Sequence, residues 1–197
     1  MSRLLQRDSF KIHRQTDMIL KHAEMMSDLF LLNRDYVGKP MVFLSHKHSD
    51  LPLLSNVIAF LKEEMDVEVY IDSQDKSLPP VPTEETANRI KKVIRESKKF
   101  LLLATEDALT SPWCNWELGH GDSIKYPDDI AILPIKEIDE ADSDYKGNEY
   151  LALYPHIVYF EGGEKDFYSD YYTPGYYVIH KTFFPVKPVP LKEWLQR

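Results

Sequence analysis

The sequence contains a single cysteine, Cys114, among 197 residues. One thiol cannot form a disulfide within the chain, nor can it supply a cysteine-based metal cluster. We therefore expect a fold without covalent cross-links, as is usual in a reducing compartment.

The chain also lacks an excess of positive charge, because 24 basic residues face 32 acidic ones and the formal net charge is −8. This balance argues against non-specific binding to nucleic acid and against adsorption to anionic membranes. No run of 18 apolar residues is present, so no membrane-spanning helix is expected. The first residues, 1–8, are not followed by the apolar stretch of a secretory signal, and we expect a cytoplasmic protein.

What the chain does contain is enough apolar material for an ordinary core, since 43% of the residues are hydrophobic. Apolar side chains between residues 1 and 36 recur at roughly helical spacing, which predicts an N-terminal helical extension over 1–37. This extension either packs on the main domain or acts as an oligomerisation arm. The segment 161–197 is rich in tyrosine and proline, and we expect an ordered, irregular extension packed on the domain or at an interface.

Between these extensions, short apolar strands alternate with segments of helical length. Such alternation predicts right-handed βαβ units and a parallel sheet. Ligands of these sheets bind beside the carboxyl ends of the strands. The predicted strands are 41–44, 67–71, 100–104, 130–135 and one within 150–160. The loops that follow the first three of them are 45–50, 72–82 and 106–113, and they would open on one common edge.

One helix predicted to begin near this edge carries an unusual pair of side chains. Ser111 suits the N-cap and Pro112 the first helical position. Trp113, Glu117 and His120 follow at i, i+4 and i+7, so they share one face. A carboxylate beside an indole could hold a flat cationic ring and stabilise a cation that forms next to it.

A simpler interpretation of the same helix stays open. Glu117 could be a surface glutamate favoured by the helix dipole. Trp113 and Trp116 could both be core anchors, and Trp116 is the one expected to pack inward or at an interface. A nucleophilic pair of Cys114 and His120 is not expected, since the cysteine lies off the Glu117 face.

Three segments together resemble the Toll/interleukin-1 receptor (TIR) domain family over roughly residues 38–160. Met41-Val42-Phe43-Leu44-Ser45-His46 resembles the first sequence box of the family. Val69-Tyr70-Ile71-Asp72 and the proline-bearing loop after it resemble the second strand and its loop. Ser111-Pro112-Trp113-Cys114-Asn115-Trp116-Glu117-Leu118 is similar to the segment that carries the catalytic glutamate in NAD-cleaving members.

The resemblance implies an α/β protein with a flavodoxin-like three-layer fold and a five-stranded parallel sheet. It also implies an NAD+ nucleosidase that cleaves the nicotinamide–ribose bond with Glu117 as the catalytic residue. NAD+ would be the substrate, with no cofactor and no metal. The residues that we assign to substrate binding are Phe43, Ser45, His46, Asp72, Asp75, Lys76 and Trp113.

Plainer roles remain open for some of these residues. Ser45 could be a turn or cap hydroxyl, and Asp72 a loop-initiating aspartate. His46 and His48 stand two residues apart without a matching carboxylate–histidine set, which is poor evidence for a metal site.

The chemistry of NAD+ fits one carboxylate. Nicotinamide leaves as a neutral molecule from a cationic precursor, so its departure needs no strong acid. The enzyme must mainly stabilise the oxocarbenium-like ribose that remains, and one ionised carboxylate can do this. An aromatic face such as Trp113 can stack on the pyridinium.

The resemblance is strongest to bacterial members of Thoeris-like antiphage defence. It implies self-association and an ADP-ribose-derived signal, cyclic in some members, that is sensed by a separately encoded effector. A non-catalytic TIR module that signals by self-association is the main alternative, and a deoxyribosyltransferase-like enzyme is a further one. The absence of a G-x-G-x-x-G turn and of a P-loop argues against dinucleotide-redox and NTPase functions.

Overall fold

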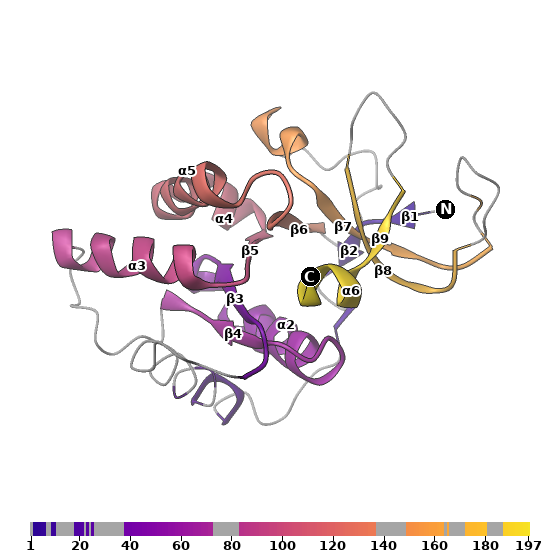
Figure 1. The fold of residues 1–197 in the computed structure, drawn as a ribbon, viewed down its shortest axis with the longest axis horizontal. Helices are drawn as coiled ribbons and strands as arrows, with labels where there is room; N and C mark the ends of the chain where they lie inside the picture. Colours follow the sequence, from indigo (N-terminus) through magenta and orange to yellow (C-terminus); the bar gives the residue numbers. More distant parts are fainter. Residues whose placement is uncertain are drawn as a thin grey trace.

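A computed structural model describes residues 2–6, 9–10, 18–21, 23, 25, 38–72, 83–136, 149–163, 165, 172–180 and 187–197, and all structural statements below concern these ranges. Within them, the protein is a mixed α/β molecule with a mostly parallel sheet and helices on both faces (Figure 1).

The strands of the described ranges form one sheet in the order β4-β3-β5-β6-β7-β8-β9. Neighbours from β4 to β7 are parallel, whereas β8 and β9 continue the sheet in antiparallel pairing. The main strands are β3 (Met41–Ser45), β4 (Glu68–Tyr70), β5 (Lys99–Ala104), β6 (Ile130–Lys136), β7 (His156–Phe160), β8 (Gly175–Ile179) and β9 (Val189–Pro190). The mixed α/β class and the mostly parallel sheet are confirmed, and the sheet is larger than the five strands predicted.

Helices follow the strands and begin at residues suited to cap them. The Thr83 hydroxyl and the Thr86 side chain form a capping box at the start of α3. The Ser111 hydroxyl accepts from the Cys114 backbone N–H at the start of α5, as the sequence predicted. The helices are η2 (His48–Asp50), α2 (Leu51–Glu63), α3 (Glu84–Glu96), α4 (Glu106–Thr110), α5 (Pro112–Lys125), η4 (Glu149–Leu153) and α6 (Leu191–Gln196).

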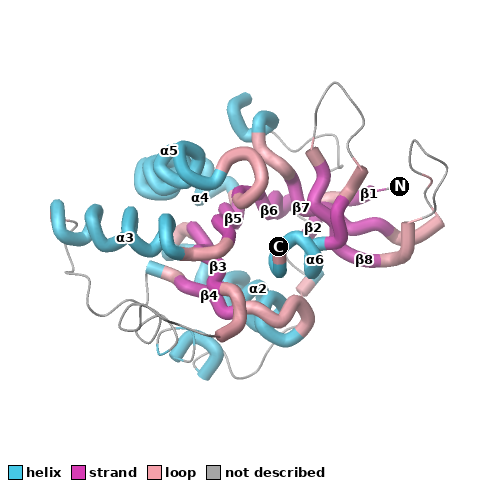
Figure 2. Tube along the Cα trace, viewed as in Figure 1, coloured by secondary structure: helices cyan, strands magenta, loops and turns pink. Residues whose placement is uncertain are grey.

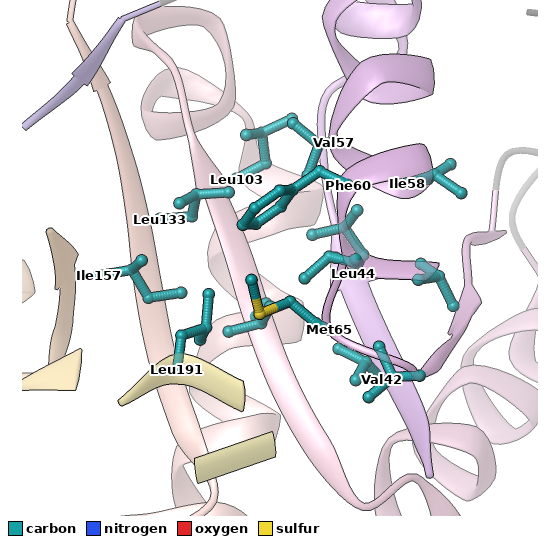
Figure 3. Packing of buried hydrophobic residues seen from close by; sticks show 14 of the residues in the cluster. Val42, Leu44, Val57, Ile58, Phe60, Met65, Leu103, Leu133, Ile157 and Leu191 are labelled. Atoms are coloured by element: carbon teal, nitrogen blue, oxygen red, sulfur yellow. The ribbon is translucent and has the colours of Figure 1, made fainter. Parts of the chain in front are cut away.

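Two hydrophobic clusters cover the two faces of the sheet. One joins α2 and α6 to the side chains of β3, β5 and β6 that point toward them, and Figure 3 shows its central residues. The other joins α3, α4 and α5 to the alternate side chains of the same strands. In Figure 1, α3, α4 and α5 accordingly lie together on one side of the sheet and α2 on the other. Because β3, β5 and β6 are buried on both faces, they are nearly continuous apolar runs.

The N-terminal segment differs from its prediction as a helix. β1 (Ser2–Arg3) pairs with β7, and β2 (Leu5–Gln6) pairs with β6. Backbone pairing with strands that are distant in sequence outweighs a local helical pattern here, as tertiary context often does. The helical prediction is confirmed for Met18–Lys21, Ala23 and Met25.

The C-terminal segment is more regular than predicted. Its described residues form β8, β9 and α6, and Figure 2 shows these strands beside β7. The sheet therefore crosses residues 37 and 160, where the sequence placed the ends of the central domain. None of the helices in the described ranges is long and apolar enough to span a bilayer.

Candidate functional site

The carboxyl edge of the sheet brings a serine of β3 against a glutamate of α5. Ser45 is the last residue of β3, and its Oγ donates a hydrogen bond of 2.6 Å to Oε2 of Glu117. The two residues are 72 positions apart, and both are fully buried, with 0% exposure. The predicted convergence of the strand end and the helix is therefore present in the structure.

Glu117 is buried without full hydrogen-bonding compensation. Burial raises its pKa well above the ordinary value, and the negative charge of Asp72 raises it further. Hydrogen bonds from Ser45 and Trp113 act in the opposite direction. Oε1 of Glu117 has no hydrogen-bond partner within the described residues. A buried polar atom left in this state is uncommon in folded proteins and marks a place where a proton or a ligand belongs.

Trp113 and Asp72 form the second contact of the site. The indole Nε1 of Trp113 donates a 3.1 Å hydrogen bond to Oδ2 of Asp72, which follows β4. The Trp113 ring also stacks on Trp116, with centroids 4.9 Å apart. Asp72 therefore holds the orientation of the indole that lies one helical turn before Glu117.

His120 does not join Glu117, although both lie on α5. Its ring stacks on Trp116 at 6.3 Å, and Nζ of Lys91 from α3 lies 5.7 Å from the same indole. Burial is the main cause that lowers the pKa of His120, with the charge of Lys91 among the lesser ones. Trp116 thus packs at the boundary of α3 and α5, in line with its expected inward position.

His46 lies beneath the Asp72–Trp113 contact. Its Nδ1 is 3.1 Å from the carbonyl oxygen of Leu44 and 3.9 Å from Oδ1 of Asp72. Burial lowers the pKa of His46, while the charge of Asp72 raises it less strongly. The lowered pKa favours the neutral imidazole, which can orient Asp72 without adding a permanent positive charge.

Phe43 is placed differently from the other predicted site residues. Its ring is fully buried and stacks between Tyr70 and Phe100, with centroids 5.4 Å from each. It belongs to the core cluster of α3 and α5 and supports the strand that carries Ser45. The predicted contacts Asp75 and Lys76 lie outside the described residues.

Sequence reasoning missed a polar bridge at the same edge. Oγ1 of Thr105, directly after β5, donates a 2.6 Å hydrogen bond to Oδ2 of Asp50 at the start of α2. Asp50 was expected to cap α2, but its side chain makes no capping hydrogen bond to that helix. The available signal was the position of both residues at strand–helix junctions of one sheet edge.

Cys114 closes the floor of the site without reactive character. Its Sγ donates to the backbone carbonyl of His46 at 3.2 Å. Burial raises the pKa of the thiol to about 11, so the nucleophilic thiolate is scarce near neutral pH. This agrees with the expectation that Cys114 is not a nucleophile.

The fold and the site together define a class of protein. It is an α/β protein whose parallel strands end at a buried carboxylate, a serine and an indole, where such sheets bind ligands. Residues 42–166 match the TIR domain family, and the chain belongs to this family. The resemblance carried by the three sequence segments is thereby confirmed.

A curated relative adds a more specific similarity. The chain is 34% identical over 119 residues to a protein of Bacillus cereus (strain MSX-D12) named "Probable 3' cyclic ADP-D-ribose synthase ThsB'". The match covers 59% of this chain and 60% of the relative's length.

Proposed function

We propose that the protein cleaves the nicotinamide–ribose bond of NAD+ and produces a cyclic ADP-ribose. The observation that carries the proposal is Glu117, a fully buried carboxyl group with one oxygen bonded to Ser45 and the other unpartnered among the described residues. The name of the Bacillus cereus relative supports the same chemistry.

The bond breaks heterolytically in this proposal. The electron pair of the C–N bond passes to the pyridinium nitrogen, nicotinamide leaves as a neutral molecule, and the ribose carbon becomes oxocarbenium-like. The ionised carboxylate of Glu117 stabilises that cation, an electrostatic effect that is strong in a site that excludes water. The positive pyridinium of bound NAD+ favours ionisation of Glu117 and so counteracts the raised pKa of the empty site.

The neighbours of Glu117 receive positioning roles. Ser45 holds one carboxylate oxygen through its 2.6 Å hydrogen bond, which leaves the other oxygen for the ribose. Trp113, oriented by Asp72, offers an aromatic face to the pyridinium. A hydroxyl of the same ADP-ribose then attacks the cationic carbon and loses its proton, which closes the ring. Attack by water instead would give ADP-ribose.

The biological setting is also a proposal. A cyclic nucleotide made by a TIR protein in the cytoplasm would act as a signal in bacterial antiphage defence, through a separately encoded effector. Self-association of the chain would complete or activate the site. A non-catalytic module that signals by self-association is the competing function.

The test is incubation of concentrated protein with NAD+, followed by chromatography and mass analysis of the products. Wild type is expected to release nicotinamide and a cyclic ADP-ribose isomer. Glu117→Gln is expected to lower the rate by at least about 100-fold, as loss of a transition-state electrostatic contact does. The matched control is Glu85→Gln, an exposed glutamate of α3, which should retain wild-type activity.

Each outcome has a defined meaning. Equal turnover by wild type and Glu117→Gln would remove Glu117 from the mechanism. ADP-ribose as the sole product would keep the cleavage and overturn the cyclisation. No turnover at any protein concentration, with or without lysate of infected cells, would favour the non-catalytic module.

A further inference from the structure

A second cavity lies away from Glu117, against the opposite face of the sheet. Its volume is about 550 Å³, within the usual range for small-molecule sites. Its lining includes Phe60 and Met65 of the α2 region and Leu191 of α6, which Figure 3 shows in the core cluster on that face. The neighbours of Glu117 on α5 belong to the other cluster. Neither the proposed reaction nor the family resemblance uses this cavity.

Aromatic rings form a connected series along the cavity. Phe60 lies 5.4 Å from Phe10 and 4.6 Å from Tyr176 between ring centroids, and Tyr176 lies 5.1 Å from Tyr159. Phe10 and Phe60 are buried, whereas Tyr159 and Tyr176 are only half-buried. The ring series therefore presents both a covered floor and accessible walls.

One end of this series already holds a cation. The guanidinium of Arg3 lies 5.2 Å from the ring centroid of Tyr159. Arg3, Tyr159 and Tyr176 line a smaller neighbouring cavity of about 210 Å³. Positive charge over an aromatic face is an attractive arrangement, and the chain itself uses it here.

The mouth of the larger cavity carries negative charge. Glu63 and Glu64 lie exposed in its lining at the C-terminal end of α2, where the helix dipole adds a partial negative charge. Lys192 is the one lysine or arginine among the described lining residues, and its positive charge acts on Asp66 beside the mouth. Burial, and next the charge of Glu64, raise the pKa of Tyr176 and keep its phenol neutral.

We propose that this cavity binds a small organic cation, with the charged head against the rings of Tyr159 and Tyr176 and near the carboxylates of Glu63 and Glu64. An aryl or alkyl ammonium fits this description, because aromatic faces and carboxylates both attract it. The volume accommodates a ligand considerably larger than the head itself.

The experiment is an NMR titration with phenyltrimethylammonium, observed at the methyl group of Met65 in the cavity wall. The expected result is a saturable shift of the Met65 signal. Tyr176→Leu removes an aromatic face and should weaken binding by about tenfold, within the range of cation–π energies. Tyr176→Phe is the matched control, because it keeps the ring, and should bind within about twofold of wild type.

Two further measurements distinguish cation binding at this cavity from general binding of aromatic molecules and from binding at Glu117. Benzyl alcohol, a neutral aromatic probe, should bind at least about fivefold more weakly than phenyltrimethylammonium. Glu117→Gln should leave the titration unchanged, since Glu117 is on the other face of the sheet. Absence of a saturable shift, equal binding of the neutral probe, or loss of binding in Glu117→Gln would each overturn the proposal.

Discussion

Glu117 combines two properties that oppose each other, full burial and the capacity for negative charge. The hydrogen bond from Ser45 favours its ionised form, but burial and the charge of Asp72 favour the protonated form. The site is therefore held in a state that costs folding free energy once the carboxyl group must ionise. Strain of this kind is typical of functional positions, where pKa values are shifted by the surroundings.

The pH dependence of stability follows from this shift. In the native protein the pKa of Glu117 lies above the ordinary value of 4.5, so the native state keeps a proton that the unfolded state has released. The free energy of unfolding contributed by Glu117 is thus fully present below the unfolded pKa and decreases as the pH rises through the native pKa. Glu117→Gln lacks this titration and should gain stability relative to wild type as the pH rises.

Urea unfolding of both proteins at about pH 4 and about pH 7 measures this difference. Linkage limits the gain to about 1.4 kcal/mol for each pH unit between the two pKa values. A stability difference that does not change between the two pH values would contradict the raised pKa. Glu85→Gln serves again as the control, because that carboxylate is exposed.

Asp72 tunes the same group from a distance. Its negative charge is the second cause of the raised pKa of Glu117, so Asp72→Asn should lower that pKa. Asparagine keeps an oxygen that can accept from the indole of Trp113. The measurement is the carboxyl carbon of Glu117 followed by NMR against pH. If the proposed reaction holds, the pH at which NAD+ cleavage reaches half its maximum falls in the same direction.

Asp107→Asn is the matched control for this shift. Asp107 lies at the same sheet edge and accepts a 2.7 Å hydrogen bond from Ser49, yet its charge is not among the causes that act on Glu117. The titration of Glu117 should be unchanged in this variant. An equal shift in both variants would mean that net charge, rather than Asp72, sets the pKa.

Single residues were predictable from sequence to the extent that one element places them. Trp113 and Glu117 follow from spacing on one helix, and Ser45 follows from the end of a strand. Phe43 was assigned to the substrate, but alternation along β3 turns its ring into the core between Tyr70 and Phe100. The pairing of Thr105 with Asp50 depends on two segments meeting in space, and local sequence carries no measure of that distance.

Among the elements, α5 carries two glycines with opposite surroundings. A Cβ at Gly119 would meet nothing within 4 Å, whereas one at Gly121 would lie 3.0 Å from Cδ2 of the buried Phe100 ring. Both positions are inside the helix, where alanine is favoured over glycine by about 0.5–1 kcal/mol. Gly119→Ala should therefore raise the free energy of unfolding by about that amount.

Gly121→Ala should have the opposite effect. The added methyl group overpacks the interface of α5 with β5, which costs about 1–3 kcal/mol and outweighs the gain in helix propensity. Urea unfolding of the two variants beside wild type is the measurement. Equal stabilisation by both substitutions would show that α5 packs less closely on Phe100 than the structure has it.

Element boundaries were predicted best where burial is continuous. The predicted strands 41–44, 100–104 and 130–135 differ from β3, β5 and β6 by one residue at an end. The two-residue strands β1 and β2 were missed, because they exist only through pairing with β7 and β6. Strands of this length have no periodicity of their own to read.

At the scale of the molecule, the C-terminal segment is part of the main core. Trp194 of α6 is 4% exposed, and its Nε1 donates a 2.9 Å hydrogen bond to the carbonyl oxygen of Asp128. Nζ of Lys99 lies 4.7 Å from the centroid of the same indole. Its neighbours Leu191 and Leu195 are fully buried with α2 and the sheet. A composition rich in tyrosine and proline predicted order here, but it could not predict which face of the sheet the segment covers.

Removal of the Trp194 side chain should therefore destabilise the whole fold rather than release a tail. Trp194→Ala is expected to lower the free energy of unfolding by about 3–5 kcal/mol, as the loss of a buried indole does. Trp194→Phe keeps most of the packing and should lose less. Far-UV circular dichroism reports the helices on both faces of the sheet, so urea unfolding followed in this way should shift as one transition. An unchanged main transition in Trp194→Ala would instead make α6 an appendage that the central sheet does not need.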